Sequence, residues 1–421
     1  MKRLGIGYED YKRFVDEDLY FVDKTMLIKE VLERGGIVTL FTRPRRFGKT
    51  LALSMLRTFF ELEYDLHGNI VEKGRYFTGK KVSGAGEEIL KHMGQYPVIH
   101  MSLKSAKQAD FYSAFLCLRE EIIREYDRHR YVLNTDRFSE ENKRKYQNYL
   151  SGISRWEEKM GRFSSLQEKE EALKEEVAKY ATALRFLSEC LFLYHDKKVI
   201  ILLDEYDVPL ETAYYQGFYQ EMVGFIRSLF ESALKTNEVL ERAMITGCLR
   251  ISRESIFTGL NHLSIVSIRS ESFAEGFGFT QKETEEFLAA YGLESKIGEV
   301  MQWYDGYLFG DTEIYNPWSL ILYIEKHIVN PDALPEPYWP NTSSNMIIKD
   351  LVEKADAETK KELEELIAGG TVEKRIHEDI TYEDIYESDD NLWNFLYFTG
   401  YMKKVSETSR NEGVYLVMCI P

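Results

Sequence analysis

The chain has 421 residues, 44% of them hydrophobic and 29% charged, so it is long enough for two or three domains around a sizeable buried core. Its formal net charge of −16 argues against a general affinity for nucleic acid, because backbone binding depends on cations that neutralise phosphates. Four widely spaced cysteines exclude a CxxC metal knuckle, and no apolar run is long enough to span a bilayer, so we expect a cytoplasmic protein without membrane contact.

Short apolar runs predict five buried strands. They lie at Ile37–Thr42, Pro97–Leu103, Val199–Leu203, Arg242–Thr246 and Ser264–Ile268. Helical stretches separate these runs, which predicts a parallel sheet and an α/β fold. The third run is continuously apolar with charged residues on both sides, which is typical of a strand covered on both faces.

The first strand leads into the stretch RPRRFGKT, and a helix-forming stretch comes next. A phosphate-binding loop places backbone N–H groups at a helix N-terminus, a lysine on the terminal phosphates and a hydroxyl on magnesium. Gly48, Lys49 and Thr50 have these three places, although Arg43 stands where the pattern GxxxxGK[ST] has its first glycine. The three arginines of the loop are expected to add positive charge beside a triphosphate. The predicted nucleotide-binding residues here are Arg43, Pro44, Arg45, Arg46, Phe47, Gly48, Lys49, Thr50 and Leu51.

The long stretch at about residues 105–195 reads as a helical insertion that projects from the sheet. In it Ser164 or Ser165 can cap a helix. The apolar stripe predicted for this helix is Leu166, Leu173, Val177, Ala181 and Leu184. Its Glu/Lys run is typical of a solvated helix face, and a surface for a protein partner is the alternative.

The third strand ends in Asp204 and Glu205, within the stretch VIILLDEYD. A magnesium-assisted NTPase needs one carboxylate beside the metal and a second that polarises the attacking water. Two acidic residues can end a strand by chance. Their order after Gly48–Thr50 favours a nucleotide site.

The fourth strand ends in Thr246, followed by GCLRISRES. In P-loop NTPases of the additional-strand type, one strand lies between the loop strand and the Asp-Glu strand, and its end carries a polar residue that contacts the γ-phosphate or its water. Thr246 has this place by order. Arg250 and Arg253 can reach the nucleotide or a neighbouring subunit, and structural ion pairs are an equal alternative.

After residue 280 the chain predicts helices rich in aromatic residues, and the proline-rich loop at Pro331, Pro335, Pro337 and Pro340 marks an internal break. The last forty or so residues predict a helix, DNLWNFLYFTG, and two short strands, YMKKV and GVYLVMCI, joined by the polar turn SETSRNE. A helix followed by a β-hairpin is how a winged-helix module ends. We therefore predict a P-loop core at residues 1–275 and a helical lid with a winged-helix-like part at residues 276–421.

Two further stretches have competing interpretations. In FVDKT, Asp23 is read as the N-cap of the next helix rather than as a residue near a bound adenine. In WYDGYLFG, the residues around Asp305 are read as aromatic packing that joins the core to the helical part, rather than as a binding loop.

These stretches together resemble a known family. YFVDKTMLIKEVLERGGIVTLFTRPRRFGKTLALSML, VIILLDEYDVPL, TGCLRISRESIFTGLNHL, FGFTQKE, WYDGYLFG, YNPWSL and LWNFLYFTGYM look like successive blocks of the bacterial and archaeal AAA-ATPase-like family, over nearly the whole chain. The arginine at position 43 is usual in that family. Its members commonly carry a C-terminal PD-(D/E)xK nuclease-type domain, which we would expect beyond residue 421.

The resemblance implies ATP as the nucleotide, with Lys49 and Thr50 on the phosphates and magnesium, Asp204 on magnesium and Glu205 as catalytic base. We expect Mg²⁺-dependent ATP binding and hydrolysis, with Thr50 and Asp204 as the metal ligands. The expected catalytic residues are Glu205, Lys49 and Thr246, and Asp204 and Arg250 complete the expected nucleotide contacts.

A nucleotide-dependent switch or scaffold with negligible turnover is the alternative function. The process that hydrolysis drives is open, as is a homo-oligomer. A nucleic-acid contact through a C-terminal wing would rest on Lys403, Lys404 and Arg410, a thin basic footprint.

Overall fold

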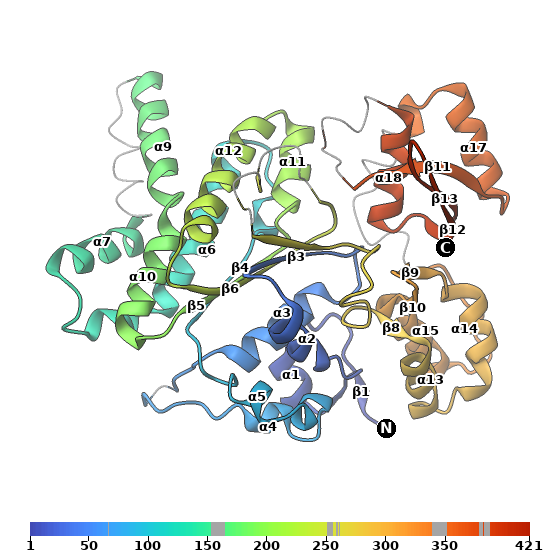
Figure 1. The fold of residues 1–421 in the computed structure, drawn as a ribbon, viewed down its shortest axis with the longest axis horizontal. Coiled ribbons are helices and arrows are strands. Elements are labelled where there is room, and N and C mark those ends of the chain that lie inside the picture. Colours follow the sequence, from blue (N-terminus) through green and yellow to red (C-terminus); the bar gives the residue numbers. More distant parts are fainter. Residues whose placement is uncertain are drawn as a thin grey trace.

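The computed structural model describes the chain except for residues 66, 153–164, 251–255, 258–259, 261, 339–351, 379–381 and 383–387. Its centre is a five-stranded parallel sheet with the strand order β4-β5-β6-β3-β7 (Figure 1). The strands are β3 (Val38–Thr42), β4 (Val98–Ser102), β5 (Val199–Asp204), β6 (Leu240–Gly247) and β7 (Leu263–Val266). All five predicted strands and their parallel arrangement are confirmed, with small shifts at the strand ends.

Helices cover both faces of this sheet, and every residue of β3 and β5 is buried between them (Figure 1). One face carries α6 (Phe111–Arg128), α10 (Ala183–His195), α11 (Val208–Gln216) and α12 (Tyr219–Phe230). The other carries α1 (Tyr11–Asp16), α2 (Met26–Arg34), α3 (Lys49–Phe60), α4 (Gly74–Phe77) and α5 (Glu87–Leu90). Two short N-terminal strands, β1 (Arg3–Leu4) and β2 (Leu19–Tyr20), pair beside them. In the described part of the chain, no helix combines the length and the apolar character that crossing a membrane requires.

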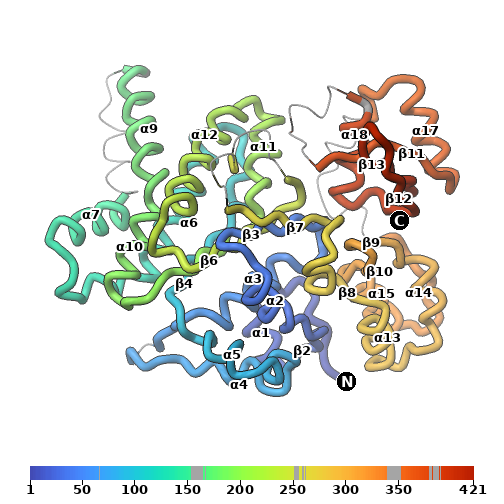
Figure 2. The backbone as a smooth tube through the Cα atoms, viewed as in Figure 1, coloured from blue at the N-terminus to red at the C-terminus, as the bar shows by residue number. Residues whose placement is uncertain are grey.

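The predicted insertion is helical and includes α6, α7 (Glu140–Leu150), α9 (Leu166–Tyr180) and α10. Figure 2 shows α9 extending away from the sheet. Ser165 is the N-cap of α9, because its side chain accepts a hydrogen bond from the backbone N–H of Glu168 at 3.2 Å. Ser164 and the side chain of Leu166 lie outside the described residues.

The apolar stripe predicted in this insertion does not belong to a single helix. Leu173 and Val177 lie on α9 and pack against the core. Ala181 lies between the two helices, and Leu184 lies in the first turn of α10. The stripe continues across this break because its residues on both helices pack in or against the same hydrophobic core.

Residues 279–329, which we call the middle module, combine helices with a small sheet that the sequence pattern did not predict. The sheet has the order β8-β10-β9 and is formed by β8 (Phe279–Thr280), β9 (Tyr307–Phe309) and β10 (Thr312–Tyr315). The helices are α13 (Gln281–Ala290), α14 (Ile297–Tyr304) and α15 (Pro317–Val329). Strands of two to four residues are too short to show an alternating pattern, which is why only helices were expected.

Residues 357–421, which we call the C-terminal module, contain α17 (Ala357–Ile367), β11 (Val372–Ile376), α18 (Asp389–Thr399), β12 (Lys403–Arg410) and β13 (Gly413–Cys419). The predicted helix and hairpin are confirmed, and β11 joins them in an antiparallel sheet of order β11-β13-β12. The predicted turn SETSRNE is wrong in its first five residues, because Ser406–Arg410 pair with β13. These residues are exposed on an edge strand, where polar side chains are compatible with pairing.

Candidate functional site

The predicted phosphate-binding loop lies at the carboxyl edge of the sheet, between β3 and α3. Gly48 is the N-cap of α3 with φ at 80°, a left-handed conformation that glycine adopts without steric cost. Among the described residues, no side chain caps α3. The first backbone N–H groups of α3 are therefore available to an anion, and the helix dipole favours negative charge there.

Lys49 is buried, and its ammonium lies inside the loop. Nζ donates hydrogen bonds to the backbone carbonyls of Arg43 and Pro44, each at 2.9 Å, and lies 3.5 Å from Sγ of Cys248. Burial raises the pKa of the Cys248 thiol, and the neighbouring Lys49 opposes that shift. A cation held by carbonyl oxygens suits a site for phosphate oxygens, because these offer the same kind of acceptor with more negative charge.

The carboxylate of Asp204, at the end of β5, meets hydroxyl groups from two other elements. Oγ1 of Thr50, in the first turn of α3, donates to Oδ2 at 2.7 Å. Oγ1 of Thr246, near the end of β6, donates to Oδ1. The structure therefore brings together three residues that the sequence analysis assigned to one site.

Glu205 follows Asp204 in a left-handed conformation with φ at 53°, which is uncommon for a residue with a side chain. Its backbone N–H donates to Oγ1 of Thr246 at 3.4 Å, and its side chain lines the cavity described next. Burial raises the pKa of the Glu205 carboxyl, the neighbouring Asp204 adds to this, and Lys49 and Lys104 oppose it. A raised pKa brings a carboxylate closer to the range in which it works as a general base near neutral pH.

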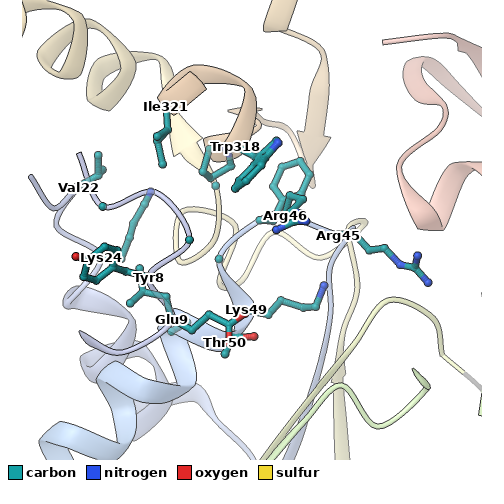
Figure 3. Close-up of a pocket in the computed structure, with 18 of the residues that line it drawn as sticks. Tyr8, Glu9, Val22, Lys24, Arg45, Arg46, Lys49, Thr50, Trp318 and Ile321 are labelled. Carbon is teal, nitrogen blue, oxygen red and sulfur yellow. The ribbon is translucent and has the colours of Figure 1, made fainter. Parts of the chain in front are cut away.

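A cavity of about 330 Å³ lies beside the loop. Figure 3 shows Lys49, Thr50 and Arg45 in one part of it, and Val22 and Ile321 away from them. The charged lining residues are Glu9, Lys24, Arg45, Arg46, Lys49, Lys104, Lys107, Glu205 and Asp207. The large apolar and aromatic ones are Leu4, Tyr8, Phe14, Tyr20, Phe21, Val22, Phe47, Leu51, Met55, Val208, Phe279, Phe287, Trp318 and Ile321. A ligand with an anionic group and a flat apolar ring would find both surfaces here.

The side chain of Arg43 does not add charge to this cavity, in contrast to the expectation for the three loop arginines. It is fully buried, and its guanidinium donates to the backbone carbonyls of Thr42, Val266 and Phe273 at 3.0, 3.1 and 3.3 Å. The rings of Phe277 and Phe309 lie within 5.3 and 4.8 Å of it. Arg43 therefore ties the start of the loop to the segment after β7.

The other two arginines line the cavity and have partners. Arg45 forms an ion pair with Glu211 of α11, and burial raises the pKa of the Glu211 carboxyl while Arg45 opposes that shift. The guanidinium of Arg46 lies 4.3 Å from the ring centre of Trp318 on α15 (Figure 3). Arg46 thereby joins the loop to the middle module.

Pro44 and Phe47 connect the loop to the two later modules. The ring of Phe47 lies 5.0 Å from Tyr307 and 5.2 Å from Phe309 of β9. The hydroxyl of Tyr307 donates a hydrogen bond to the carbonyl of Gly400 at 3.0 Å. Gly400 also packs against Pro44, and a Cβ added at Gly400 would lie only 2.8 Å from the Cβ of Pro44. The interpretation of WYDGYLFG as aromatic packing between the core and the later part is confirmed.

Arg250 does not line the cavity. It forms an ion pair with Glu378 of the C-terminal module at 3.7 Å, and Glu378 also accepts a hydrogen bond from Ser267 at 3.0 Å. The structure thus favours the structural alternative for Arg250. Arg253 lies outside the described residues.

Asp23 has a local structural role. Its side chain accepts hydrogen bonds from the backbone N–H of Thr25 at 2.9 Å and of Lys81 at 2.7 Å. Thr25, rather than Asp23, is the N-cap of α2. The predicted N-cap is therefore two residues too early, because Asp23 bonds just ahead of the helix.

Five charged lining residues escaped the sequence analysis: Glu9, Lys24, Lys104, Lys107 and Asp207. Three of them lie at or just after strand ends. Asp207 accepts hydrogen bonds at Oδ2 from the backbone N–H groups of Cys248 and Leu249, at 2.6 and 3.1 Å, while its buried Oδ1 has no partner among the described residues. Lys104 and Lys107 follow β4. Two sequence features could have identified these three residues: the second aspartate of DEYD, and the lysines of LKSAK after the second strand. Both follow strands of the parallel sheet, and the carboxyl ends of neighbouring parallel strands meet at one edge of the sheet.

Comparison with known proteins shows which family the chain is similar to. The model of a family described as "Predicted AAA-ATPase" matches residues 5–257, which include the loop, Asp204, Glu205 and Thr246. An uncharacterized protein in the vnfD 5′ region of Azotobacter chroococcum mcd 1 is 25% identical over 366 residues, covering 85% of this chain and 57% of that protein. The chain thus spans less than two thirds of the length of this relative. Because the family model covers more than half of the chain, the protein belongs to the AAA-ATPase-like family.

Proposed function

We propose that the protein binds ATP with Mg²⁺ and hydrolyses it. One observation carries the proposal: the hydroxyl of Thr50 lies 2.7 Å from the carboxylate of Asp204, beside a loop that encloses the ammonium of Lys49. Lysine, hydroxyl and carboxylate in this arrangement are the groups that P-loop NTPases use for the phosphates and their metal ion. Membership of the AAA-ATPase-like family supports nucleotide binding.

The residues present fit a magnesium ion bound together with phosphates. Within the described part of the chain, no group of three or more His, Cys, Asp or Glu residues is suited to hold a metal ion. Mg²⁺ commonly takes one or two carboxylates and leaves its other positions to phosphates and water, so Thr50 and Asp204 are sufficient protein ligands. When bound, the ion would neutralise charge that develops on the phosphates.

The remaining residues have separate tasks in the proposed hydrolysis. Glu205 orients the attacking water and accepts its proton, for which its raised pKa is favourable. Lys49 stabilises charge on the terminal phosphates. Thr246 holds both the Asp204 carboxylate and the backbone of Glu205, and so positions the two acids relative to each other.

The apolar part of the cavity is the proposed site of the purine ring. Tyr8 comes from the N-terminal segment, and Trp318 and Ile321 come from α15 of the middle module (Figure 3). Aromatic and aliphatic walls from two sides suit a flat ring that stacks and loses its contact with water. The middle module would then act as a lid over the nucleotide.

We also propose a P-loop core of the additional-strand type followed by a lid and a winged-helix-like end, divided near residue 275. The position of β6 between β3 and β5 supports the first part. The three-stranded antiparallel sheet beside α18 supports the last.

Binding and turnover can be tested separately. Lys49→Ala should lower the affinity for Mg·ATP by at least tenfold, since a charge-assisted contact is worth about 1.5–3 kcal/mol. Glu205→Gln should keep the affinity and lower kcat by about 10²- to 10⁴-fold, as expected for loss of a general base. Calorimetric titration and phosphate release measure the two effects. Wild-type turnover equal to that of Glu205→Gln, with binding intact, would leave only the nucleotide-dependent switch.

A further inference from the structure

The backbone at Lys104 is anchored to the strand that carries the two acidic residues. Ser102, the last residue of β4, is paired with Asp204 in the sheet, and the N–H of Leu103 donates to the carbonyl of Asp204 at 3.0 Å. Lys104 is the next residue along the chain and begins the short 3₁₀ helix Lys104–Ala106. Its position relative to Asp204 and Glu205 is therefore set by main-chain hydrogen bonds.

The side chain of Lys104 belongs to the same cavity as Lys49, Thr50 and Glu205. Burial lowers the pKa of the Lys104 ammonium, and the carboxylates of Glu9, Glu205 and Asp204 outweigh this effect and raise it. Lys49 reaches the cavity from α3, after β3, whereas Lys104 comes from the segment after β4 at one edge of the sheet. The two cations thus belong to different elements around a single site.

The partner of Lys104 differs in exposure from the partners of other cations in this cavity. Arg45 pairs with Glu211, and Lys24 pairs with Glu283, and both of those carboxylates are buried. Lys104 pairs with Glu9 at 3.1 Å, and the two side chains are 57% and 61% exposed. An exposed ion pair contributes little, because water screens it, so a phosphate with more negative charge can replace Glu9.

Glu9 lies in the cavity in which a phosphate would replace it as the partner of Lys104. It lines the cavity together with Gly7 and Tyr8, so the Lys104–Glu9 ion pair joins the N-terminal segment to the segment after β4 across the site. If the Lys104 ammonium pairs with a phosphate instead of Glu9, the Glu9 carboxylate becomes hydrated by water.

We propose that Lys104 contacts the terminal phosphate of ATP and supplies in cis a cation of the kind that other ATPases bring as an arginine. This inference rests on the proposed function. In this role Lys104 exchanges Glu9 for the γ-phosphate, and stabilises charge on the phosphate that is transferred to water. A contact that exists only with the terminal phosphate distinguishes ATP from ADP.

The test compares the affinities of full-length variants for two probes, the non-hydrolysable analogue β,γ-imido-ATP and ADP, both with Mg²⁺. Lys104→Ala should weaken binding of the analogue about tenfold and leave ADP binding within about twofold, because one charge-assisted contact to the γ-phosphate is lost. Lys104→Arg should restore most of the preference. Glu9→Gln should strengthen analogue binding, since the competing carboxylate is neutralised.

Lys91→Ala is the matched control. Lys91 is 58% exposed, pairs with Glu88 on the surface and does not line the cavity. It should leave both affinities unchanged. Equal losses for the analogue and ADP in Lys104→Ala, or no loss for either, overturn the inference while the proposed function stands. Failure of the wild type to bind either probe overturns the proposed function, and the role of Lys104 with it.

Discussion

The hydroxyl of Thr50 donates a hydrogen bond to the carboxylate of Asp204 at 2.7 Å, although 154 residues separate them in the chain. The second oxygen of the same carboxylate accepts a hydrogen bond from Thr246 on β6. Asp204 is thereby the point at which the proposed phosphate-binding loop, β5 and β6 meet. Its structural role in joining these elements and its proposed role in binding a cation can be separated by experiment.

Asp204→Asn is expected to abolish the strengthening of nucleotide binding by Mg²⁺ without unfolding the protein. The amide keeps the volume and can still accept a hydrogen bond, but it lacks the negative charge that attracts the ion. Thermal stability should be unchanged or slightly higher, because a buried carboxylate is costly. Titrations with and without Mg²⁺, beside the exposed control Asp196→Asn, measure the effect. A Mg²⁺ dependence equal to that of the wild type would contradict the role of Asp204.

The pH dependence of kcat/KM should show the raised pKa of Glu205. Burial and the adjacent Asp204 favour the protonated, inactive form, so the rate should fall as the pH drops through a value above about 4.3, the ordinary glutamate pKa. Lys104→Ala removes a cation that opposes this shift and should move the acid limb to higher pH. An acid limb unaffected by Lys104→Ala, or one at the ordinary glutamate value, would speak against this assignment.

Gly400→Val should weaken nucleotide binding more than Gly369→Val, a variant with the same kind of backbone strain. Gly400 has φ at 91°, and a side chain there would collide with Pro44, whose carbonyl holds the ammonium of Lys49. Gly369→Val is the matched control, since Gly369 has φ at 88° in the same module and open space around it. Both variants should lose about 1–2 kcal/mol of stability from the left-handed conformation. A loss of affinity in Gly400→Val alone would show that the C-terminal module supports the loop; equal affinities would exclude it.

Acidification should destabilise the fold through two linked histidines. Burial is the main cause that lowers the pKa of His129 to about 3 and of His195 to about 4, and the hydroxyl of Tyr131 lies 3.0 Å from a ring nitrogen of each. Between pH 6.5 and these values the unfolded chain binds protons that the folded chain does not, so stability falls as the pH falls. Each pKa unit corresponds to about 1.4 kcal/mol. Urea unfolding at several pH values gives the free energy of unfolding as a function of pH. This free energy should change less steeply with pH in His129→Gln than in the exposed control His67→Gln.

The strands and the loop were predictable because their signals are local. A short apolar run rich in β-branched residues, such as Val199–Leu203, favours a covered strand. The spacing of Gly48, Lys49 and Thr50 after β3 needs no distant partner to be recognised. The short strands of the middle module, and the pairing of polar Ser406–Arg410, were not predictable. Their pairing depends on partner strands rather than on their own pattern.

Side-chain direction was also beyond the sequence. Arg43 and Arg45 are two positions apart, yet one guanidinium bonds to carbonyls of Val266 and Phe273 and the other lines the cavity. These two carbonyls lie 223 and 230 residues further along the chain. No local pattern contains that information.

The amino-acid sequence by itself determined the order of the elements and the chemistry at the strand ends, because hydrophobic pattern and loop spacing act over a few residues. Only the tertiary structure decided which charges share the cavity: it turned Arg43 and Arg250 away, and it placed Lys104 and Glu205 in the same lining. The physical reason is that a parallel sheet gathers the carboxyl ends of strands distant in the chain at one edge, where the packing of later modules selects the side chains that face the site.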